Sequence, residues 1–230
     1  MHEAPGPQIK NQILAALPAE DYQRLSPHLE TVDLVHAQVL YEMGGAVDHI
    51  YFPTNAMVSL VTEMSDGKIV EVGVVGREGI TGMTALMGDE TSPERAIVQI
   101  ADGGRRARFG IVKEEFLRGG QLHKLLLNYA RQLMRQVSQT AACNASHTAE
   151  ERLARWLLMC LDRVDGNELK LTQEFIAQML GTRRATVSLA AMVLQSDGLI
   201  QSNRGHIKVL DRSGLEEFTC ECYQAARVFR

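Results

Sequence analysis

The chain has 230 residues, a formal net charge of −4 and 45% hydrophobic residues. This length and composition allow one large or two small domains with a substantial core, and the slightly acidic balance excludes a histone-like protein that is basic throughout. The first twenty residues lack a basic segment followed by an apolar run, and no stretch is apolar for long enough to cross a membrane. We therefore expect a cytoplasmic protein with no membrane partner.

The N-terminal half is predicted to contain short helices followed by many short strands. Residues 8–28 have helical spacing, with Ile13, Leu14, Leu17 and Leu25 on one face. From Thr31 onward, β runs alternate with breaks rich in Gly, Asp and Ser. The runs cover residues 32–35, 39–41, 49–52, 57–62, 69–75, 96–100 and 106–111. This pattern predicts a β-barrel or jelly-roll-like sandwich, to which we assign residues 1–120.

A long helix is predicted from about residue 121 to residue 146. Along it, apolar and small residues fall at alternating steps of four and three, which is the a/d seam of a left-handed two-stranded coiled coil. The seam residues are Leu126, Ala130, Leu133, Val137, Thr140 and Asn144. We expect a parallel homodimer through this seam, and we assign residues 121–147 as the dimerisation helix. The alternative is a helix that packs on its own β domain, with Leu122, Leu125 and Tyr129 facing inward.

The long helix is predicted to end at a hinge near residues 145–148, where a second helix begins. Thr148 and Glu151 have the spacing of a capping box, in which each side chain bonds the backbone N–H of the other residue. We assign residues 148–230 to a C-terminal domain.

Residues 171–189 are the most informative stretch of the chain. They have the pattern of two short amphipathic helices around Gly181, a turn position that requires a positive φ. Thr172 and Thr182 are each placed to cap the N-terminus of one helix. The core-facing positions are Phe175, Ile176, Met179 and Leu180 in the first helix and Val187, Ala191 and Leu194 in the second.

The second helix opens with polar residues outside its apolar stripe, namely Arg183, Arg184, Thr186 and Ser188. Residues 175–196 carry two arginines and no acid. Arginines and hydroxyls at the front of a helix reach base edges and phosphates in a DNA major groove. The pattern therefore predicts a helix-turn-helix with an exposed recognition helix. The alternative is a small helical domain that contains one glycine-centred helix pair without binding DNA.

A β-hairpin is predicted directly after this helix, within residues 197–209. Two alternating strands flank a turn at Asn203, Arg204 and Gly205. A hairpin in this place is the wing of a winged helix, whose Arg204, His206 and Lys208 would face the phosphate backbone.

On these motifs, the C-terminal segment resembles the DNA-binding domain of the Crp/Fnr superfamily of bacterial transcription regulators. The N-terminal half resembles the cyclic-nucleotide-binding-type β-roll of the same family, and the resemblance runs from about Ile13 to the wing. It implies an α+β fold with a β-roll, a dimerisation helix and a winged helix-turn-helix. It also implies a homodimeric regulator, not an enzyme, that binds a pseudo-palindromic site in double-stranded DNA and contacts RNA polymerase.

The resemblance also implies roles for individual residues of the recognition helix. Arg184 matches the family arginine that reads guanine, whereas Ala185 replaces a glutamate and Leu189 replaces a second arginine, so the operator should differ from that of the best-known members. The candidate DNA-binding residues are Thr172, Thr182, Arg183, Arg184, Ala185, Thr186, Ser188, Arg204 and Lys208.

In the family's ligand-binding cassette, a Gly-Glu pair binds the ribose and an Arg followed by a small residue binds the cyclic phosphate. The matching residues here are Gly76, Glu78, Gly82, Met83, Arg95 and Ala96. Met83 stands where the glutamate should be, and a thioether is a poor acceptor for a hydroxyl. We expect weak binding of cyclic AMP or none. The alternatives are a scaffold in which Arg95 pairs with Glu78 or Glu94, an unidentified effector, or a cyclic-nucleotide-responsive regulator.

Other chemistries receive less support from the sequence. Residues 1–142 contain no cysteine, which excludes an N-terminal iron–sulfur cluster. A haem ligand among His28, His36, His49 and His123 is improbable because a lone histidine in a β domain is usually structural. A cupin-type metal enzyme needs a His-x-His motif, which the chain lacks. A regulatory subunit that does not bind DNA is a further alternative, against which the arginine-led helix counts.

The cysteines are predicted to be structural. None of Cys143, Cys160, Cys220 and Cys222 forms a C-x-x-C pair. We expect a helix over residues 215–223, in which two-residue spacing would place Cys220 and Cys222 on different sides, although a redox role for them stays open. No cofactor and no metal are predicted, and the effector is left open.

Overall fold

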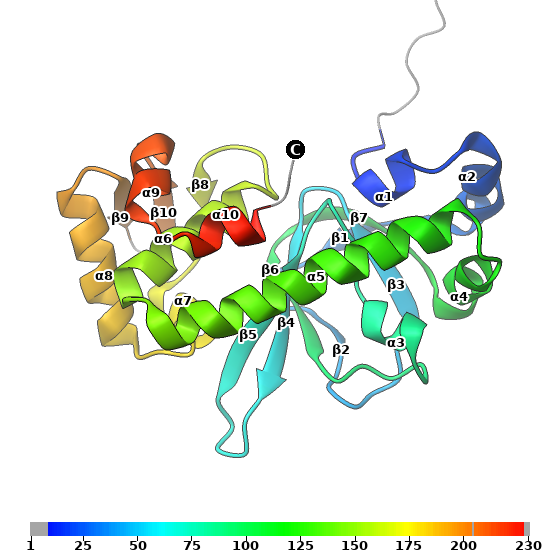
Figure 1. Ribbon diagram of the computed structural model, residues 1–230, viewed down its shortest axis with the longest axis horizontal. Coiled ribbons are helices and arrows are strands. Elements are labelled where there is room, and N and C mark those ends of the chain that lie inside the picture. Colours follow the sequence, from blue (N-terminus) through cyan, green and yellow to red (C-terminus); the bar gives the residue numbers. More distant parts are fainter. Residues whose placement is uncertain (1–8, 204, 228–230) are drawn as a thin grey trace, which may run out of the picture.

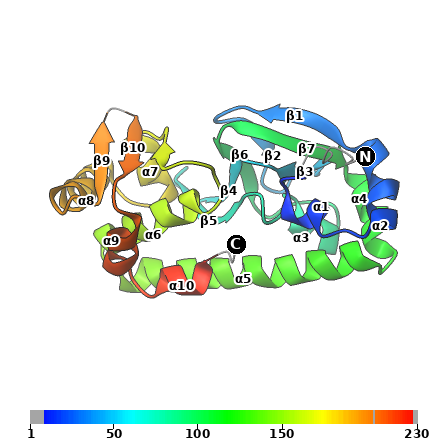
Figure 2. The same cartoon turned by 90° about the horizontal axis from the view of Figure 1, so that it is seen from above.

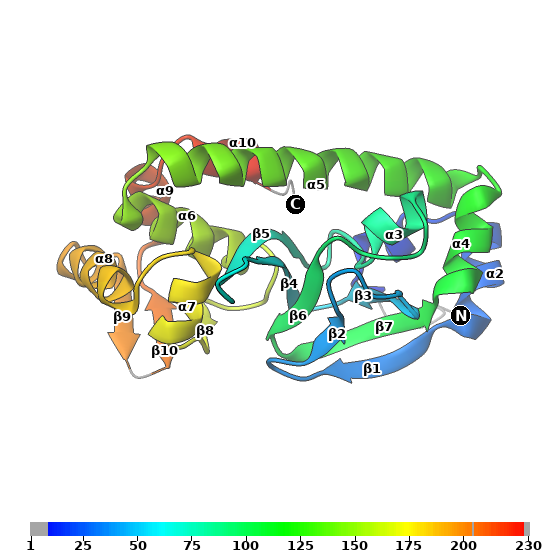
Figure 3. The same ribbon diagram turned by 90° about the horizontal axis from the view of Figure 1, so that it is seen from below.

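One long helix, α5 (Gln121–Ser146), runs along the molecule and connects an N-terminal β half to a C-terminal helical half (Figure 1). The computed structural model describes residues 9–203 and 205–227. Figure 3 shows α5 passing both halves along one edge of the molecule. The predicted long helix is confirmed, and among the described residues no helix is both long and apolar enough to span a membrane.

The N-terminal half consists of two antiparallel sheets with short helices around them. One sheet has the strand order β1-β7-β3 and the other β2-β6-β4-β5. The elements are α1 (Gln12–Ala15), α2 (Ala19–Leu25), η1 (Ser26–His28), β1 (Glu30–Leu34), β2 (Val39–Tyr41), β3 (His49–Pro53), β4 (Met57–Glu63), β5 (Ile69–Val75), α3 (Met83–Met87), β6 (Arg95–Ile100), β7 (Asp102–Arg108) and α4 (Phe109–Leu117). Apolar strand residues such as Ile50, Phe52 and Val98 fill the space between the sheets, and all three are fully buried.

The predicted strand at residues 106–111 is wrong at both ends. The strand β7 begins earlier, at Asp102, and α4 begins at Phe109. Gly103 and Gly104 both pair with β1, and Gly104 also pairs with β3. A Cβ on Gly104 would lie 3.2 Å from Leu34 Cδ1, so glycine is used here for the close approach of a neighbouring strand.

The C-terminal half is a small helical domain with a three-stranded sheet of order β8-β10-β9. Its elements are α6 (Ala149–Leu161), β8 (Glu168–Leu169), α7 (Gln173–Met179), α8 (Arg184–Ser196), β9 (Ile200–Asn203), β10 (His206–Val209), α9 (Arg212–Phe218) and α10 (Cys222–Ala226). The predicted capping box is confirmed, because both hydrogen bonds between Thr148 and Glu151 are present at the start of α6. Figure 2 shows α10 beside the C-terminal part of α5.

The two halves share one apolar cluster. Met57, Val61, Val74 and Ile97 of the N-terminal half pack with the buried residues of α6, α7 and α8. The hairpin of β4 and β5 also contacts α7 (Figure 1). The halves are therefore held together by side-chain packing as well as by the covalent connection through the hinge.

The predicted dimer seam is wrong for half of its residues. Leu126 is fully buried and Leu133 is 9% exposed within this single chain, because α5 lies on its own β half. Thr140 also faces inward, where its Oγ1 accepts a hydrogen bond from Arg155 Nη1 at 3.3 Å. The residues that follow Leu126 and Leu133 lie on the solvent-exposed face of α5: Leu127 is 44% exposed and Met134 is 68% exposed.

Candidate nucleic-acid interface and sensor pocket

The helix-turn-helix is formed by α7, a turn at Gly181 and α8. Thr172 caps α7 as predicted, since its Oγ1 accepts a hydrogen bond from Phe175 N at 3.1 Å. Gly181 has φ +59°, which confirms the predicted positive φ. The prediction that Thr182 caps α8 is wrong: the N-cap is Arg183, without a side-chain cap bond. The reason is that Thr182 N donates to Ala177 O at 2.9 Å, so Thr182 still belongs to the end of α7.

The predicted apolar stripe of α8 is buried, and the arginines at its start are exposed, although Leu189, Met192 and Val193 are exposed as well. Val187, Ala191 and Leu194 are buried against α6 and α7, whereas Arg183 and Arg184 are exposed. Within the described residues, neither guanidinium takes part in an ion pair. The first turn of α8 therefore presents two unneutralised cations to solvent.

Two of the other three candidates on α8 are less accessible than the arginines. Thr186 and Ser188 are half-buried, and Ala185 is exposed. Ser188 Oγ donates to Gln173 Oε1 at 2.7 Å, which ties α8 to the first turn of α7. Ser188 is thus engaged in holding the two helices together.

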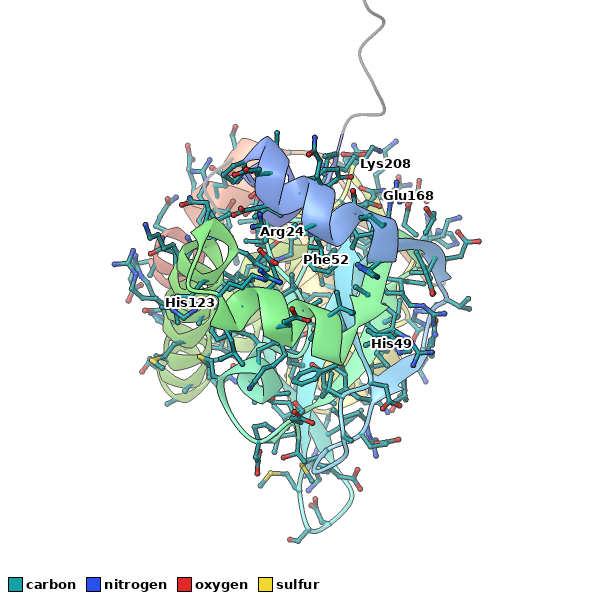
Figure 4. The ribbon with its side chains drawn as sticks, turned by 90° about the vertical axis from the view of Figure 1, so that its right-hand side faces the viewer. Arg24, His49, Phe52, His123, Glu168 and Lys208 are labelled. Carbon is teal, nitrogen blue, oxygen red and sulfur yellow. The ribbon has the colours of Figure 1, made fainter. Side chains whose placement is uncertain are left out.

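The wing is present where the sequence predicts it. β9 and β10 pair from Ile200↔Val209 to Asn203↔His206. Lys208 is exposed and lies opposite Glu168 of β8 at the edge of the molecule (Figure 4). His206 Nδ1 lies 3.1 Å from Glu168 Oε1, so this ring faces a carboxylate. Arg204 lies outside the described residues.

A groove separates the front of α8 from the β4–β5 hairpin of the N-terminal half. Its volume is about 980 Å³, and its lining includes Lys68, Thr182, Arg183 and Thr186. At one end the contact is close, because a Cβ on Gly181 would lie 3.2 Å from the Val70 side chain. The N-terminal half therefore touches the turn that positions the recognition helix.

Arg95 of the predicted cassette is neutralised by two glutamates. Its guanidinium hydrogen-bonds Glu42 through Nε, and its Nη2 lies 3.0 Å from Glu63 Oε2. The expectation that Arg95 pairs with Glu78 or Glu94 is therefore wrong, because both partners come from other β strands or turns. Glu94 instead accepts hydrogen bonds from Thr84 and Ser92.

Glu78 lies in the contact between the two halves. Its Oε1 accepts a hydrogen bond from Arg163 Nε at 2.7 Å, and both side chains are almost fully buried. Gly76 and Gly79 allow this approach: a Cβ on Gly76 would lie 2.7 Å from Arg163 Cγ, and one on Gly79 would lie 2.1 Å from the Tyr129 ring. Glu78 thus takes part in an ion pair between the two halves, and Gly76 allows the close approach of Arg163.

The remaining cassette residues lie in the β core. Gly82 has φ +71° and is the N-cap of α3, and its N–H donates to Tyr41 Oη at 3.0 Å. Met83 is 2% exposed, and Ala96 is fully buried in β6. The six predicted residues therefore divide among the core, the contact between the halves and an ion-paired arginine.

A second buried polar contact between the halves was not predicted from the sequence. Trp156 Nε1 of α6 donates to Glu71 Oε1 of β5 at 2.8 Å. Burial raises the pKa of the Glu71 carboxyl to about 7. With Glu78 and Arg163 these residues form what we call the joint. The partners in each pair are 85 positions apart, so no local pattern could have indicated them.

One group of side chains that could hold a metal ion was not singled out in the sequence. Among the described residues, Cys143, His147, Cys220 and Cys222 bring their ligand atoms within 4.8 Å of one another. They lie where α5 ends and α10 begins.

Two protein-family models match the chain. Residues 32–101 match the cyclic nucleotide-binding domain, and residues 151–218 match the Crp-like helix-turn-helix domain. Together the two matches cover more than half of the chain. No curated protein sequence matches it significantly.

Solved structures with the same fold are numerous. FixK2 from Bradyrhizobium japonicum is 18% identical with a TM-score of 0.71, over 84% of this chain and 98% of that one. The c-di-GMP responsive global regulator CLP of Xanthomonas campestris is 15% identical with a TM-score of 0.68, over 84% and 100%. A putative transcriptional regulator of the Crp/Fnr family from Eubacterium rectale is 18% identical with a TM-score of 0.66, over 90% and 97%. At these identities the likeness concerns the fold.

Proposed function

Because the chain belongs to the Crp/Fnr family of transcription regulators, we propose that it binds a pseudo-palindromic DNA operator as a homodimer. The observation that carries this proposal is the first turn of α8, where Arg183 and Arg184 are exposed and form no ion pair within the described part of the chain. Exposed cations at the start of a helix whose opposite face packs on the domain core suit a major groove.

The operator contacts follow from the chemistry of the α8 surface. Arg184 would read guanine through two hydrogen bonds, which contributes about 1–3 kcal/mol of discrimination. The exposed apolar residues Ala185 and Leu189 suit thymine methyl groups, since neither can hydrogen-bond a base. Phosphate contacts would come from the other polar candidates, which are Thr172, Thr182, Arg183, Thr186 and Lys208.

The dimer would form through the outer face of α5. Leu127, Met134 and Ala141 are exposed and seven positions apart, and Ala130, Val137 and Asn144 alternate with them at steps of three and four. This gives a complete a/d seam that leaves Leu126 and Leu133 to the β core. Two chains are needed because each carries one recognition helix, and the two half-sites lie about 34 Å apart.

Light scattering tests the seam. Met134→Asp would place a carboxylate in the seam and should give folded monomers. Gln132→Asp changes an exposed residue on the opposite flank of α5 and should leave the dimer intact. A Met134→Asp protein that stays dimeric would place the interface elsewhere.

We expect the β-roll to bind cyclic AMP weakly or not at all. Arg95 is held by Glu42 and Glu63, Met83 is buried in the core, and Glu78 is used in the joint. A cyclic phosphate would have to displace two carboxylates from Arg95. Equilibrium dialysis with labelled cyclic AMP should therefore detect no saturable binding at micromolar ligand, and tight binding would refute this expectation. As the protein partner of the DNA-bound dimer we propose RNA polymerase.

The proposed function is tested by selection of bound sequences from a random DNA pool with the purified protein and no added ligand. Enrichment of an inverted repeat with a half-site spacing of one DNA turn is the expected result. Enrichment of single half-sites would contradict the homodimer. No enrichment, combined with weak and salt-insensitive binding to DNA, would contradict the proposed function itself.

A further inference from the structure

Four side chains that commonly bind metals meet at the C-terminal end of α5. Cys143 lies in the last turn of α5, and His147 is the C-cap residue, whose N–H donates to the Cys143 carbonyl at 3.1 Å. Cys220 and Cys222 approach them from the segment between α9 and α10. All four ligand atoms lie within 4.8 Å of one another, and the three cysteines are buried. We call these residues the Cys₃His cluster.

The cluster exists because the expected helix over residues 215–223 is broken. α9 ends at Phe218, and Thr219 is extended with ψ 160° before α10 begins at Cys222. In a continuous helix the thiols of Cys220 and Cys222 would point to different sides. The break turns both toward α5, against which α10 packs.

The distances fit a tetrahedral ion better than a disulfide. Cys143 Sγ lies 3.6 Å from Cys220 Sγ, and Cys222 Sγ lies 3.5 Å from His147 Nδ1. A zinc ion with Zn–S bonds of about 2.3 Å and Zn–N bonds of about 2.0–2.1 Å separates its ligands by about 3.6–3.8 Å in a tetrahedron. A disulfide needs about 2.05 Å between sulfur atoms, and all four cysteines of the chain are free.

Two further residues occupy the positions that support metal ligands. Glu221 Oε2 lies 3.3 Å from His147 Nε2, the ring nitrogen that does not face the thiols. Gln139 Nε2 donates to Cys222 Sγ at 3.0 Å. A carboxylate on the second nitrogen of a ligating histidine fixes its tautomer and orientation, and N–H donors stabilise a thiolate.

One buried cation near the cluster, Arg155, forms no ion pair within the described residues, and the carboxyl nearby is that of Glu71, whose raised pKa favours its neutral form. Arg155 is 2% exposed and bonds only the neutral atoms Thr140 Oγ1 and Met159 Sδ, while its Nε has no partner in the described part of the chain. A buried charge without an opposite charge is strongly destabilising. Three thiolates and one neutral imidazole around a divalent ion carry a net charge of −1, which would compensate Arg155.

From this geometry we propose that Cys143, His147, Cys220 and Cys222 bind one Zn²⁺ ion per chain. Four protein ligands close the coordination sphere, so the ion is structural and has no position for substrate. It would bind α10 to the last turn of α5 and so hold the C-terminal half beside the hinge.

The proposal is tested by metal analysis of the full-length protein purified under reducing conditions. The expected result is one zinc per chain, replaceable by Co²⁺ with the absorption bands of a tetrahedral thiolate complex. Cys222→Ser and His147→Ala should each lose the ion. Cys160→Ser is the matched control, because Cys160 is also buried and free but contacts Gln99 rather than the cluster, and it should retain the ion.

A second variant keeps the test decisive if the ligand variants fail to fold. Glu221 is largely exposed, so Glu221→Gln should fold normally and weaken zinc affinity about tenfold or more in competition with a chelator. A reduced wild-type protein that takes up no zinc or cobalt would overturn the proposal. So would a Cys143–Cys220 disulfide in a protein that never binds metal, or an equal loss of metal in Cys160→Ser.

Discussion

In the joint, Arg163 is 1% exposed and its guanidinium is fixed by Glu78 and by the Met159 carbonyl, whereas Arg183 and Arg184 at the front of α8 are exposed and unpaired within the described residues. An arginine is thus neutralised within the protein in the joint, whereas the arginines of α8 remain available to a binding partner. Removal of a charge should therefore affect folding in the joint and recognition in α8.

The joint should be the more sensitive region. Arg163→Met leaves Glu78 buried without a counter-charge, and we expect a loss of about 3–5 kcal/mol in the free energy of unfolding by urea titration. Arg106→Met is the matched control, because its ion pair with Glu30 is exposed to solvent and should contribute far less to stability. The double variant Glu78→Gln with Arg163→Met should regain most of the loss. If Arg163→Met and Arg106→Met lowered the free energy of unfolding equally, the buried ion pair of the joint would be no more important for stability than an exposed one.

The second buried contact of the joint should make stability depend on pH. Burial raises the pKa of Glu71 from 4.5 to about 7, so between these values the folded protein keeps a proton that the unfolded chain has lost. Stability should therefore fall as pH rises through this range, by up to about 1.4 kcal/mol per pH unit from this group. Glu71→Gln should flatten that part of the profile in urea titrations at pH 5, 6, 7 and 8. Glu174→Gln, an exposed change, should leave the slope as it is in wild type.

At the front of α8, the effect should appear in DNA recognition alone. Arg184→Ala should lose about 1–3 kcal/mol of preference for the selected operator over a variant with one guanine replaced, while the thermal midpoint stays unchanged. Arg118→Ala removes an exposed arginine that is remote from α8 in the sequence and should alter neither quantity. Retained operator preference in Arg184→Ala would show that another element reads the bases.

The wing should show the smallest effect. Lys208→Ala removes one exposed cation opposite Glu168 and should reduce the slope of log affinity against log salt by about one, uniformly across DNA sequences. Filter binding at several salt concentrations measures it. A change in sequence preference instead would assign Lys208 to base contact.

The sequence predicted well those features that depend on neighbours in the chain. The Thr172 cap, the capping box of Thr148 and Glu151, the positive φ of Gly181 and the hairpin of β9 and β10 each follow from residues a few positions apart. The α8 surface was predicted for the same reason. Thr182 failed as a cap because one more residue was needed to complete the end of α7.

Features that depend on distant contacts were not predictable. The heptad pattern of α5 is real, but the sequence could not show which side the β half would cover, and Leu126 and Leu133 were assigned to the wrong face. Glu78 was considered as a ligand-binding residue. Its true partner, Arg163, is 85 positions away, so the local sequence could not indicate the ion pair. The Cys₃His cluster was missed because it requires a break after Phe218 that no glycine or proline marks.

The helix α5 also has a mechanical consequence. Its 26 residues contain no glycine or proline, and at about 1.5 Å per residue it is a rod about 39 Å long. Tyr129 packs on the Gly79 loop near one end, Gln136 holds the β5 backbone at Val74 in the middle, and the other end carries Cys143 and His147. Because α5 is a continuous helix attached at three places, it should rotate as one body rather than bend at one point. We therefore expect a rotation that begins at the β half to reach the hinge between α5 and α6.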